Sequence, residues 1–201
     1  MIYLVRHGQT VWNSLGKLQG QKDSPLTVKG IAQAGAVGGL LSETLAVEGG
    51  AKPKIVASPL GRAWQTAVVV ADRLGIAASE IALEPRIAEI GFGDWQGHRE
   101  ADLARDFPEL WAERATDKWN FVVPGGESYA MVAARLQAWR AELDSGAPLV
   151  AVSHGLAGRI LRGLYLKLPP EDVFAMDEPQ DGFFRLSQGA ITRFDVTPGE
   201  V

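Results

Sequence analysis

Two of the three histidines in this sequence stand in nearly the same local setting. His7 comes shortly after the apolar run 2–5 and His154 comes shortly after the apolar run 148–152, and a glycine follows each histidine. Such runs are typical of buried parallel strands, whose carboxyl ends meet at one edge of a sheet. A single histidine in such a place is as often a hydrogen-bonded loop residue. The matched pair predicts a functional site at this edge.

Two arginines accompany these histidines. Arg6 directly precedes His7, and Arg62 falls in the first turn of a helix predicted after a third apolar run, 54–57. The dipole of a helix disfavours a cation in its first turn, so an anion bound at that helix end would explain Arg62. A guanidinium can bind two phosphate oxygens at once. Although an arginine is more often an exposed surface charge, the position of Arg6 after a buried strand favours an anion-binding role.

The motifs that contain these residues resemble the signature of the histidine phosphatase superfamily, the phosphoglycerate mutase-like proteins. That signature begins with R-H-G-[EQ]-[ST] ahead of a tryptophan-asparagine pair, and further similar motifs follow in the family's order over most of the chain. The matching segments are Arg6-His7-Gly8-Gln9-Thr10 with Trp12-Asn13, Asp23-Ser24-Pro25-Leu26-Thr27, Ser58-Pro59-Leu60 with Arg62, Glu89 to Gly97, Pro124 to Ser128, and Ser153-His154-Gly155.

The resemblance implies a role for each matching residue. His7 would be the nucleophile, and Arg6, Arg62 and His154 would surround the transferred phosphoryl group. The resemblance places Asn13, Gln19 and Gly20 in contact with substrate, and Gly155 is a further candidate because a glycine lets its main-chain N–H approach closely.

The chemistry of phosphoryl transfer agrees with this assignment. The reaction needs an in-line nucleophile and positive groups that neutralise the equatorial oxygens. The arginines and a protonated His154 could supply that charge without a metal ion or other cofactor. His7 must attack through a neutral nitrogen, so its other ring nitrogen should donate to a fixed acceptor such as a backbone carbonyl. Gly8 and Gly155 would let main-chain N–H groups approach the phosphate closely.

A carboxyl group must protonate the leaving oxygen and later accept a proton from water, which requires a raised pKa. Glu89 precedes a glycine-rich turn and has apolar neighbours, so partial burial is expected. From the sequence alone Glu84, Asp94 and Glu127 are comparable candidates, and a surface glutamate is the commoner case. The resemblance to the family places Glu89 first.

The elements that must position these residues alternate between short apolar runs and amphipathic stretches, as in a parallel α/β sheet. The predicted strands are 2–5, 54–57, 148–152 and a closing edge strand at 190–196; the predicted helices are one that Thr27 caps, 60–74, 128–143 and 156–166. The prediction is an α/β fold in one histidine phosphatase domain, 1–201. It is a three-layer α/β/α sandwich with a mostly parallel sheet, helices on both faces, and a helical insertion over the carboxyl ends of the strands.

The insertion, about 95–126, is expected to form a cap over the site, and no residue in it is assigned a catalytic role. His98 has no motif around it and is predicted to be structural or exposed. Trp95, Trp111 and Trp119 could line a pocket for an apolar leaving group, since aromatic side chains offer rigid apolar area. Packing of the insertion onto the sheet is the favoured interpretation.

Composition excludes several other classes of function. The 201 residues carry a net charge of −4, so nucleic acid and anionic membranes are not expected as partners. The absence of cysteine excludes a thiolate nucleophile and thiolate metal sites. No apolar run reaches the roughly 20 residues of a membrane span, and no signal peptide is recognised, so a cytoplasmic protein is expected. The edge strand could pair between copies, which leaves a monomer or a homodimer.

The sequence predicts a phosphomonoester hydrolase that acts through a phosphohistidine on a small phosphorylated metabolite. The alternative is a cofactor-dependent phosphoglycerate mutase, which returns the phosphoryl group to another hydroxyl of the bound molecule. The short chain and Ile90 after Glu89, where mutases have arginine, favour the phosphatase. A non-catalytic module for phosphorylated ligands is less favoured, because a binder needs neither nucleophile nor acid. Relatives act on sugar phosphates, phosphoglycerates, nucleotide-like phosphates and α-ribazole phosphate, and the sequence does not choose among them.

Overall fold

The computed structural model describes residues 1–49, 51–144 and 146–197. A six-stranded sheet runs through its centre in the order β3-β2-β4-β1-β5-β6. The first four strands of the chain are parallel, whereas β5 is antiparallel to β1 and β6 is antiparallel to β5. The strands are β1 (Ile2–Arg6), β2 (Lys54–Ala57), β3 (Ala82–Leu83), β4 (Leu149–Ser153), β5 (Gly182–Ser187) and β6 (Ala190–Asp195).

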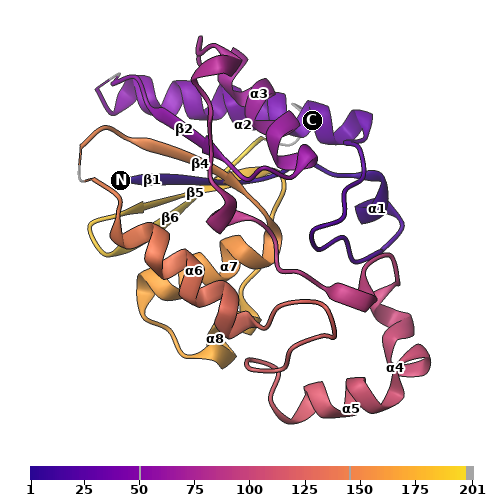
Figure 1. Ribbon diagram of the computed structural model, residues 1–201. Coiled ribbons are helices and arrows are strands. Elements are labelled where there is room, and N and C mark those ends of the chain that lie inside the picture. The colour runs from indigo at the N-terminus through magenta and orange to yellow at the C-terminus, as the bar shows by residue number, and fades with distance from the viewer. Residues whose placement is uncertain (50, 145, 198–201) are drawn as a thin grey trace.

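Helices cover both faces of the sheet, which gives the predicted three-layer α/β/α arrangement (Figure 1). Successive side chains of β1 point to opposite faces, as in any strand. Tyr3 and Val5 pack in the core under α2 and α3, whereas Ile2 and Leu4 pack in the core with α6 and α7. The helices on the two faces are α2 (Val28–Val47), α3 (Gly61–Arg73), α6 (Tyr129–Ala141), α7 (Gly155–Leu166) and α8 (Pro170–Ala175).

The predicted strands and helix starts agree with the structure to within one or two residues. The hydroxyl of Thr27 accepts the N–H of Gly30 at 3.0 Å, and the hydroxyl of Ser128 accepts the N–H of Met131 at 3.2 Å. Each cap satisfies one N–H group that the first helical turn leaves without a partner. The closing strand β6 lies at the sheet edge, as predicted.

Two elements at the C-terminal side were not indicated by the sequence pattern. β5 lies between β1 and β6, and its adjacent Phe183 and Phe184 are both buried, one in each core. A strand buried on both faces shows no alternation of polar and apolar residues. Pro170 was predicted to lie beyond the last helix but instead begins α8, because proline is tolerated in a first turn.

The cap, defined here as residues 95–126, extends beyond the carboxyl ends of the parallel strands (Figure 1). Its α-helices are α4 (Leu103–Asp106) and α5 (Pro108–Thr116), so it is less helical than predicted. Trp95 is buried, and its ring centroid lies 5.7 Å from that of Phe121 and 6.0 Å from that of Trp111. Trp119 packs on Tyr129 of α6. Trp111 and Trp119 thus pack as the favoured interpretation predicts, whereas Trp95 packs in the core and also lines the cavity described below.

Within the described ranges, no helix combines the length and the apolar character needed to cross a membrane.

Candidate active site

The register of β1 on β4 brings the two histidines together. Arg6 pairs with Ser153 in this parallel ladder, so the residues that follow, His7 and His154, leave neighbouring strands side by side. Their rings lie edge to face with centroids 5.1 Å apart, and both side chains are buried. Two residues that are distant in the chain therefore meet at the carboxyl edge of the sheet.

The His7 imidazole is held in one tautomer. Its Nδ1 lies 2.8 Å from the carbonyl oxygen of Gly8, and since that oxygen can only accept, Nδ1 carries the proton. Nε2 then accepts the Nε–H of Arg62 at 3.2 Å. Burial, followed by the charges of Arg62 and Arg6, holds the pKa of His7 well below its usual range. His7 therefore offers a neutral Nε2, with a backbone carbonyl behind it, as a nucleophile requires.

Arg62 is buried and uses every nitrogen of its guanidinium. Besides the bond to His7, Nη1 donates to the carbonyl oxygen of Lys22 at 2.9 Å and Nη2 donates to that of Gly20 at 2.7 Å. Nη1 also donates to the Asp23 carboxylate at 3.1 Å, and that carboxylate accepts the main-chain N–H of Arg62 at 3.3 Å. Asp23 thus supplies a negative charge at the start of α3 that the sequence analysis expected only from a bound anion, and contact of Arg62 with an anion stays a prediction.

Arg6 extends from the end of β1 to the loop that precedes β5. Nη1 donates to the main-chain carbonyl of Glu178, and Nη2 lies 4.0 Å from the Glu178 carboxylate. Its Nε is buried and has no hydrogen-bond partner in the described part of the chain. Burial lowers the pKa of Arg6, while the charges of Glu178 and Glu89 act in the opposite direction. Arg6 thus brings a partly neutralised cation to the edge where His7 lies.

His154 differs from the sequence prediction in its charge. Its Nε2 lies 2.7 Å from the hydroxyl of Ser58, the residue after β2. Burial, and then the charges of Arg62, His7 and Arg6, hold the pKa of His154 well below its usual range. The expectation of a protonated His154 is therefore wrong for this structure, because burial beside arginines disfavours a further positive charge.

A cavity of about 270 Å³ opens beside His7, between the strand ends and the cap. The predicted site residues that line it are Arg6, His7, Asn13, Gln19, Gly20, Arg62 and Glu89. His154 and Gly155 border a smaller hollow of about 20 Å³ that Arg6 and Glu178 share. Most of the predicted site residues therefore line one cavity. The other two, His154 and Gly155, lie at the smaller hollow.

Glu89 is buried at the N-terminus of α7. Its carboxylate accepts the N–H groups of Ala157 at 3.0 Å, Leu156 at 3.3 Å and its neighbour Ile90 at 3.1 Å. These bonds fix the carboxyl group against the start of the helix while leaving it on the cavity wall.

The three rival carboxyls lie elsewhere. Glu84 binds Arg86 at 2.8 Å and Glu127 binds Arg135 at 3.0 Å, and neither they nor Asp94 belong to the residues lining the cavity.

The glycines beside the histidines make room for protein atoms. A Cβ on Gly8 would overlap with the backbone of Gly30, and the Gly8 N–H donates to the Thr66 hydroxyl at 3.1 Å. A Cβ on Gly155 would overlap with the Glu178 carboxylate. Close packing therefore accounts for a glycine at both positions, and the Gly8 N–H is bonded within the protein, whereas an N–H contact from Gly155 to a phosphate stays a prediction.

The cavity also contains charged residues that the sequence did not single out. They are Lys17, Glu100, Arg114, Lys118, Arg159 and Glu178. With Arg6, Arg62 and Glu89 included, six cations and three glutamates line the cavity of a chain whose net charge is −4. Arg159 lies on α7 near His154, which is a weak signal, but nothing in the sequence around Arg114 or Lys118 marks them. Only the placement of the cap brings them to the cavity.

The family model described as "Histidine phosphatase superfamily (branch 1)" matches residues 2–192. This chain belongs to the histidine phosphatase superfamily. It is 38% identical to the protein named "Probable phosphoglycerate mutase GpmB" of Enterobacter sp. (strain 638) over 84% of this chain and 75% of that relative. The sequence match shows the family, and the residue roles suggested by the motifs stay predictions.

Solved structures of other histidine phosphatases share the fold. A mycobacterial glucosyl-3-phosphoglycerate phosphatase is 29% identical, with a TM-score of 0.75 over 98% of this chain and 97% of that one. The α-ribazole phosphatase from Shigella flexneri is 24% identical, with a TM-score of 0.78 over 97% of this chain and 95% of that one. The latter likeness establishes the three-layer fold alone.

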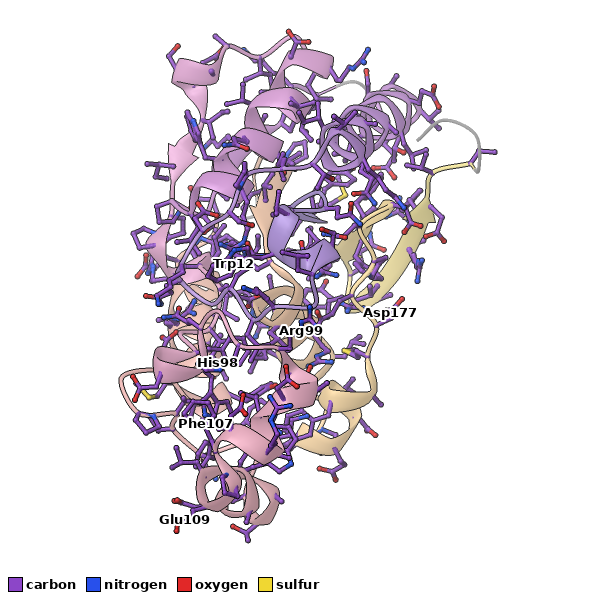
Figure 2. The ribbon with its side chains drawn as sticks, turned by 90° about the vertical axis from the view of Figure 1, so that its right-hand side faces the viewer. Trp12, His98, Arg99, Phe107, Glu109 and Asp177 are labelled. Atoms are coloured by element: carbon purple, nitrogen blue, oxygen red, sulfur yellow. The ribbon has the colours of Figure 1, made fainter. Side chains whose placement is uncertain are left out.

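His98 lies in the cap and is not part of the cavity lining. Figure 2 shows it near Phe107, whose ring centroid lies 5.0 Å from that of His98. Its Nδ1 also lies 3.8 Å from Asp106. The structural role predicted for His98 is consistent with these contacts. Among the described residues, no three histidine, aspartate or glutamate side chains are grouped so as to hold a metal ion.

Proposed function

We propose that this histidine phosphatase hydrolyses phosphomonoesters through a phosphohistidine at His7. The observation that carries the proposal is the state of His7. The Nδ1–H of His7 donates to the Gly8 carbonyl, and the pKa of the imidazole is lowered. His7 lines a cation-rich cavity. A neutral imidazole nitrogen fixed beside arginines is suited to attack on a phosphoryl group.

In the first step, Nε2 of His7 forms a bond to phosphorus as the bond from phosphorus to the leaving oxygen breaks. Glu89, in its carboxylic acid form, donates its proton to that oxygen, and the alcohol departs. The Nε–H of Arg62, which donates to Nε2 at 3.2 Å, redirects its hydrogen bond to a phosphate oxygen as Nε2 reacts, and Arg62 keeps its proton. Arg6 and Arg62 neutralise charge on the equatorial oxygens.

In the second step, the Glu89 carboxylate accepts a proton from water, and the water oxygen bonds to phosphorus. The bond from phosphorus to Nε2 breaks, inorganic phosphate leaves, and His7 and Glu89 return to their starting states. No metal ion enters either step, so we expect EDTA to have little effect on turnover.

Hydrolysis is favoured over mutase chemistry by the residue after Glu89, which is Ile90 where mutases carry an arginine. A non-catalytic binding role is disfavoured because nucleophile, acid and arginines all surround one cavity. The name of the relative from Enterobacter keeps the mutase as the alternative to be tested.

The substrate class follows from the charge of the cap side of the cavity. Lys17, Arg114 and Lys118 line it in addition to the arginines beside His7. Cations away from the reacting phosphoryl group favour a leaving group that is itself negatively charged. We therefore propose small anionic phosphomonoesters, such as phosphoglycerates and their derivatives, which is consistent with the mycobacterial phosphatase named for glucosyl-3-phosphoglycerate.

The test is phosphate release across a panel of phosphoglycerates, sugar phosphates, nucleotides, α-ribazole phosphate and p-nitrophenyl phosphate. Rapid quenching with a ³²P-labelled substrate should trap an acid-labile, base-stable phosphoenzyme. A separate assay supplies 3-phosphoglycerate with a trace of 2,3-bisphosphoglycerate. Rapid formation of 2-phosphoglycerate without free phosphate would replace the phosphatase with the mutase.

We further propose that residues 1–201 form one domain that acts in the cytoplasm as a monomer or a homodimer, without nucleic acid or membrane partners. The continuous sheet and the negative net charge support this proposal. Light scattering and fractionation of the cells that produce the protein would test it.

A further inference from the structure

One carboxylate on the cavity wall has no task in the proposed reaction. Glu178 lies in the loop before β5, next to Asp177, which Figure 2 shows on the outer side of the molecule. Its Oε1 lies 3.3 Å from Nη1 of Arg159 and its Oε2 lies 4.0 Å from Nη2 of Arg6. Gly155 leaves the space that this carboxylate occupies. A negative charge therefore lies between two of the cations that line the cavity.

The two arginines do not depend on that carboxylate for their position. Arg6 donates to the main-chain carbonyl of Glu178, which any residue at this position would provide. Arg159 donates through Nη1 to the carbonyl oxygens of Phe174 and Met176, both at 3.3 Å. Main-chain oxygens thus hold both guanidinium groups, and what the Glu178 side chain adds is chiefly its charge.

Asp23 provides a contrast at the other arginine of the site. Its carboxylate accepts two hydrogen bonds from Arg62, one from the side chain and one from the main chain. Removing that carboxylate would release the Arg62 guanidinium from one of its anchors. Removing the Glu178 carboxylate would leave two anchored cations without their counterion.

We propose that the Glu178 carboxylate is an internal counterion that competes with phosphate for Arg6 and Arg159, and that it thereby weakens product binding and speeds phosphate release. A charge buried in this way is costly, and burial indeed raises the pKa of Glu178. The cost is offset if the site must bind a transition state tightly without retaining inorganic phosphate. The inference rests on the proposed phosphatase function of the same cavity.

The experiment measures the equilibrium binding of inorganic phosphate by calorimetry, which needs no turnover. In Glu178→Gln the side chain keeps its size but loses its charge. We expect the dissociation constant for phosphate to fall at least roughly fivefold, the effect of one unit charge about 4 Å away even when it is screened as strongly as in bulk water. Phosphate should also become a stronger product inhibitor, and KM should fall more than kcat. Glu178→Asp, which keeps the charge, should bind phosphate much as the unmodified protein does.

Asp23→Asn is the matched comparison, and there we expect the opposite sign, weaker phosphate binding. Circular dichroism and thermal unfolding verify that each variant is folded; if Glu178→Gln is not, Glu178→Ala provides the same loss of charge. A dissociation constant that is unchanged or higher in the uncharged variant overturns the inference. If Glu178→Gln binds phosphate more tightly but the unmodified protein hydrolyses no substrate of the panel, the counterion role stands and the proposed phosphatase function is wrong.

Discussion

The floor of the cavity, at the strand ends, and its cap are built in different ways. On the floor the guanidinium of Arg62 has a hydrogen-bond partner at each of its three nitrogens, and His7 is fixed by a carbonyl on one side and an arginine on the other. In the cap the cations lie over aromatic rings: the Arg114 guanidinium is 5.0 Å from the Trp111 centroid, and the Lys118 ammonium is 4.4 Å from that of Phe174. A ring leaves the N–H groups of a cation free for other partners.

The two constructions suit two different tasks. A transition state is stabilised best by groups that need no rearrangement, and a network of buried hydrogen bonds provides them. Selection of the leaving group needs charge at a distance with some freedom to adapt. Changes to the floor should therefore reduce kcat, whereas changes to the cap should act on KM and on the choice of substrate.

The most severe way to break the floor is to remove the nucleophile. We expect His7→Gln to lower kcat by a factor on the order of 10⁴ with the fold intact, because no other group can form the covalent intermediate. The measurement is phosphate release, with circular dichroism as a check of folding. His98→Gln, a histidine of the cap outside the cavity, is the control and should retain full activity. Substantial turnover in the His7 variant would exclude the phosphohistidine mechanism.

A smaller change to the floor keeps the positive charge at position 62 but removes the planar guanidinium group. In Arg62→Lys an ammonium cannot reach His7 Nε2, Lys22 and Gly20 at once, so kcat should fall by about 10²-fold. KM should change much less. Arg105→Lys replaces an exposed arginine and serves as the control. If KM rather than kcat responded, the role assigned to Arg62 in the reaction would be wrong.

The cap should show the converse pattern. For Arg114→Gln and Lys118→Gln we expect KM for an anionic phosphomonoester to rise about tenfold, since each variant removes one cation from the cavity wall. With p-nitrophenyl phosphate KM should change little, because the p-nitrophenyl group of this ester is uncharged. Equal effects on both substrates would mean that these cations bind the phosphoryl group itself. The separation of tasks between floor and cap would then fail.

The last prediction concerns stability and tests the burial of the two histidines on the floor. His7 and His154 have lowered pKa values in the folded protein, so between those values and the usual value near 6.5 the unfolded chain binds more protons. The free energy of unfolding should therefore be fully retained above about pH 6.5 and fall as the pH decreases, by at most about 1.4 kcal/mol per pH unit for each histidine. Urea unfolding at pH 7 and pH 5 measures this loss.

His154→Asn is the control for that measurement, because asparagine does not titrate. The decrease between pH 7 and pH 5 should be smaller in this variant than in the unmodified protein. An equal decrease in both proteins would show that protonation of His154 does not lower the free energy of unfolding in this pH range.

Much of this protein was determined by the sequence alone. Local patterns were sufficient for the strands that end near Arg6 and Ser153, for the cap at Thr27, for the start of the helix near Ser128, and for the signature residues around His7. These features depend on neighbours in the chain, since strand periodicity, capping and motif spacing are local. The convergence of His7 and His154 also followed, because parallel strands end at a common edge.

The tertiary structure decided the rest. Glu178 and the cations of the cap come from distant segments, and no local signal marked their approach to the cavity. Asp23 stands in one of the matching motifs, but its pairing with Arg62 was not predicted. The charge of His154 was wrongly predicted because it depends on burial and on nearby arginines, which exist only once the chain is folded. The reactive groups could be read from short motifs, whereas their protonation and counterions, and the charges facing the leaving group, depend on how remote segments pack around them.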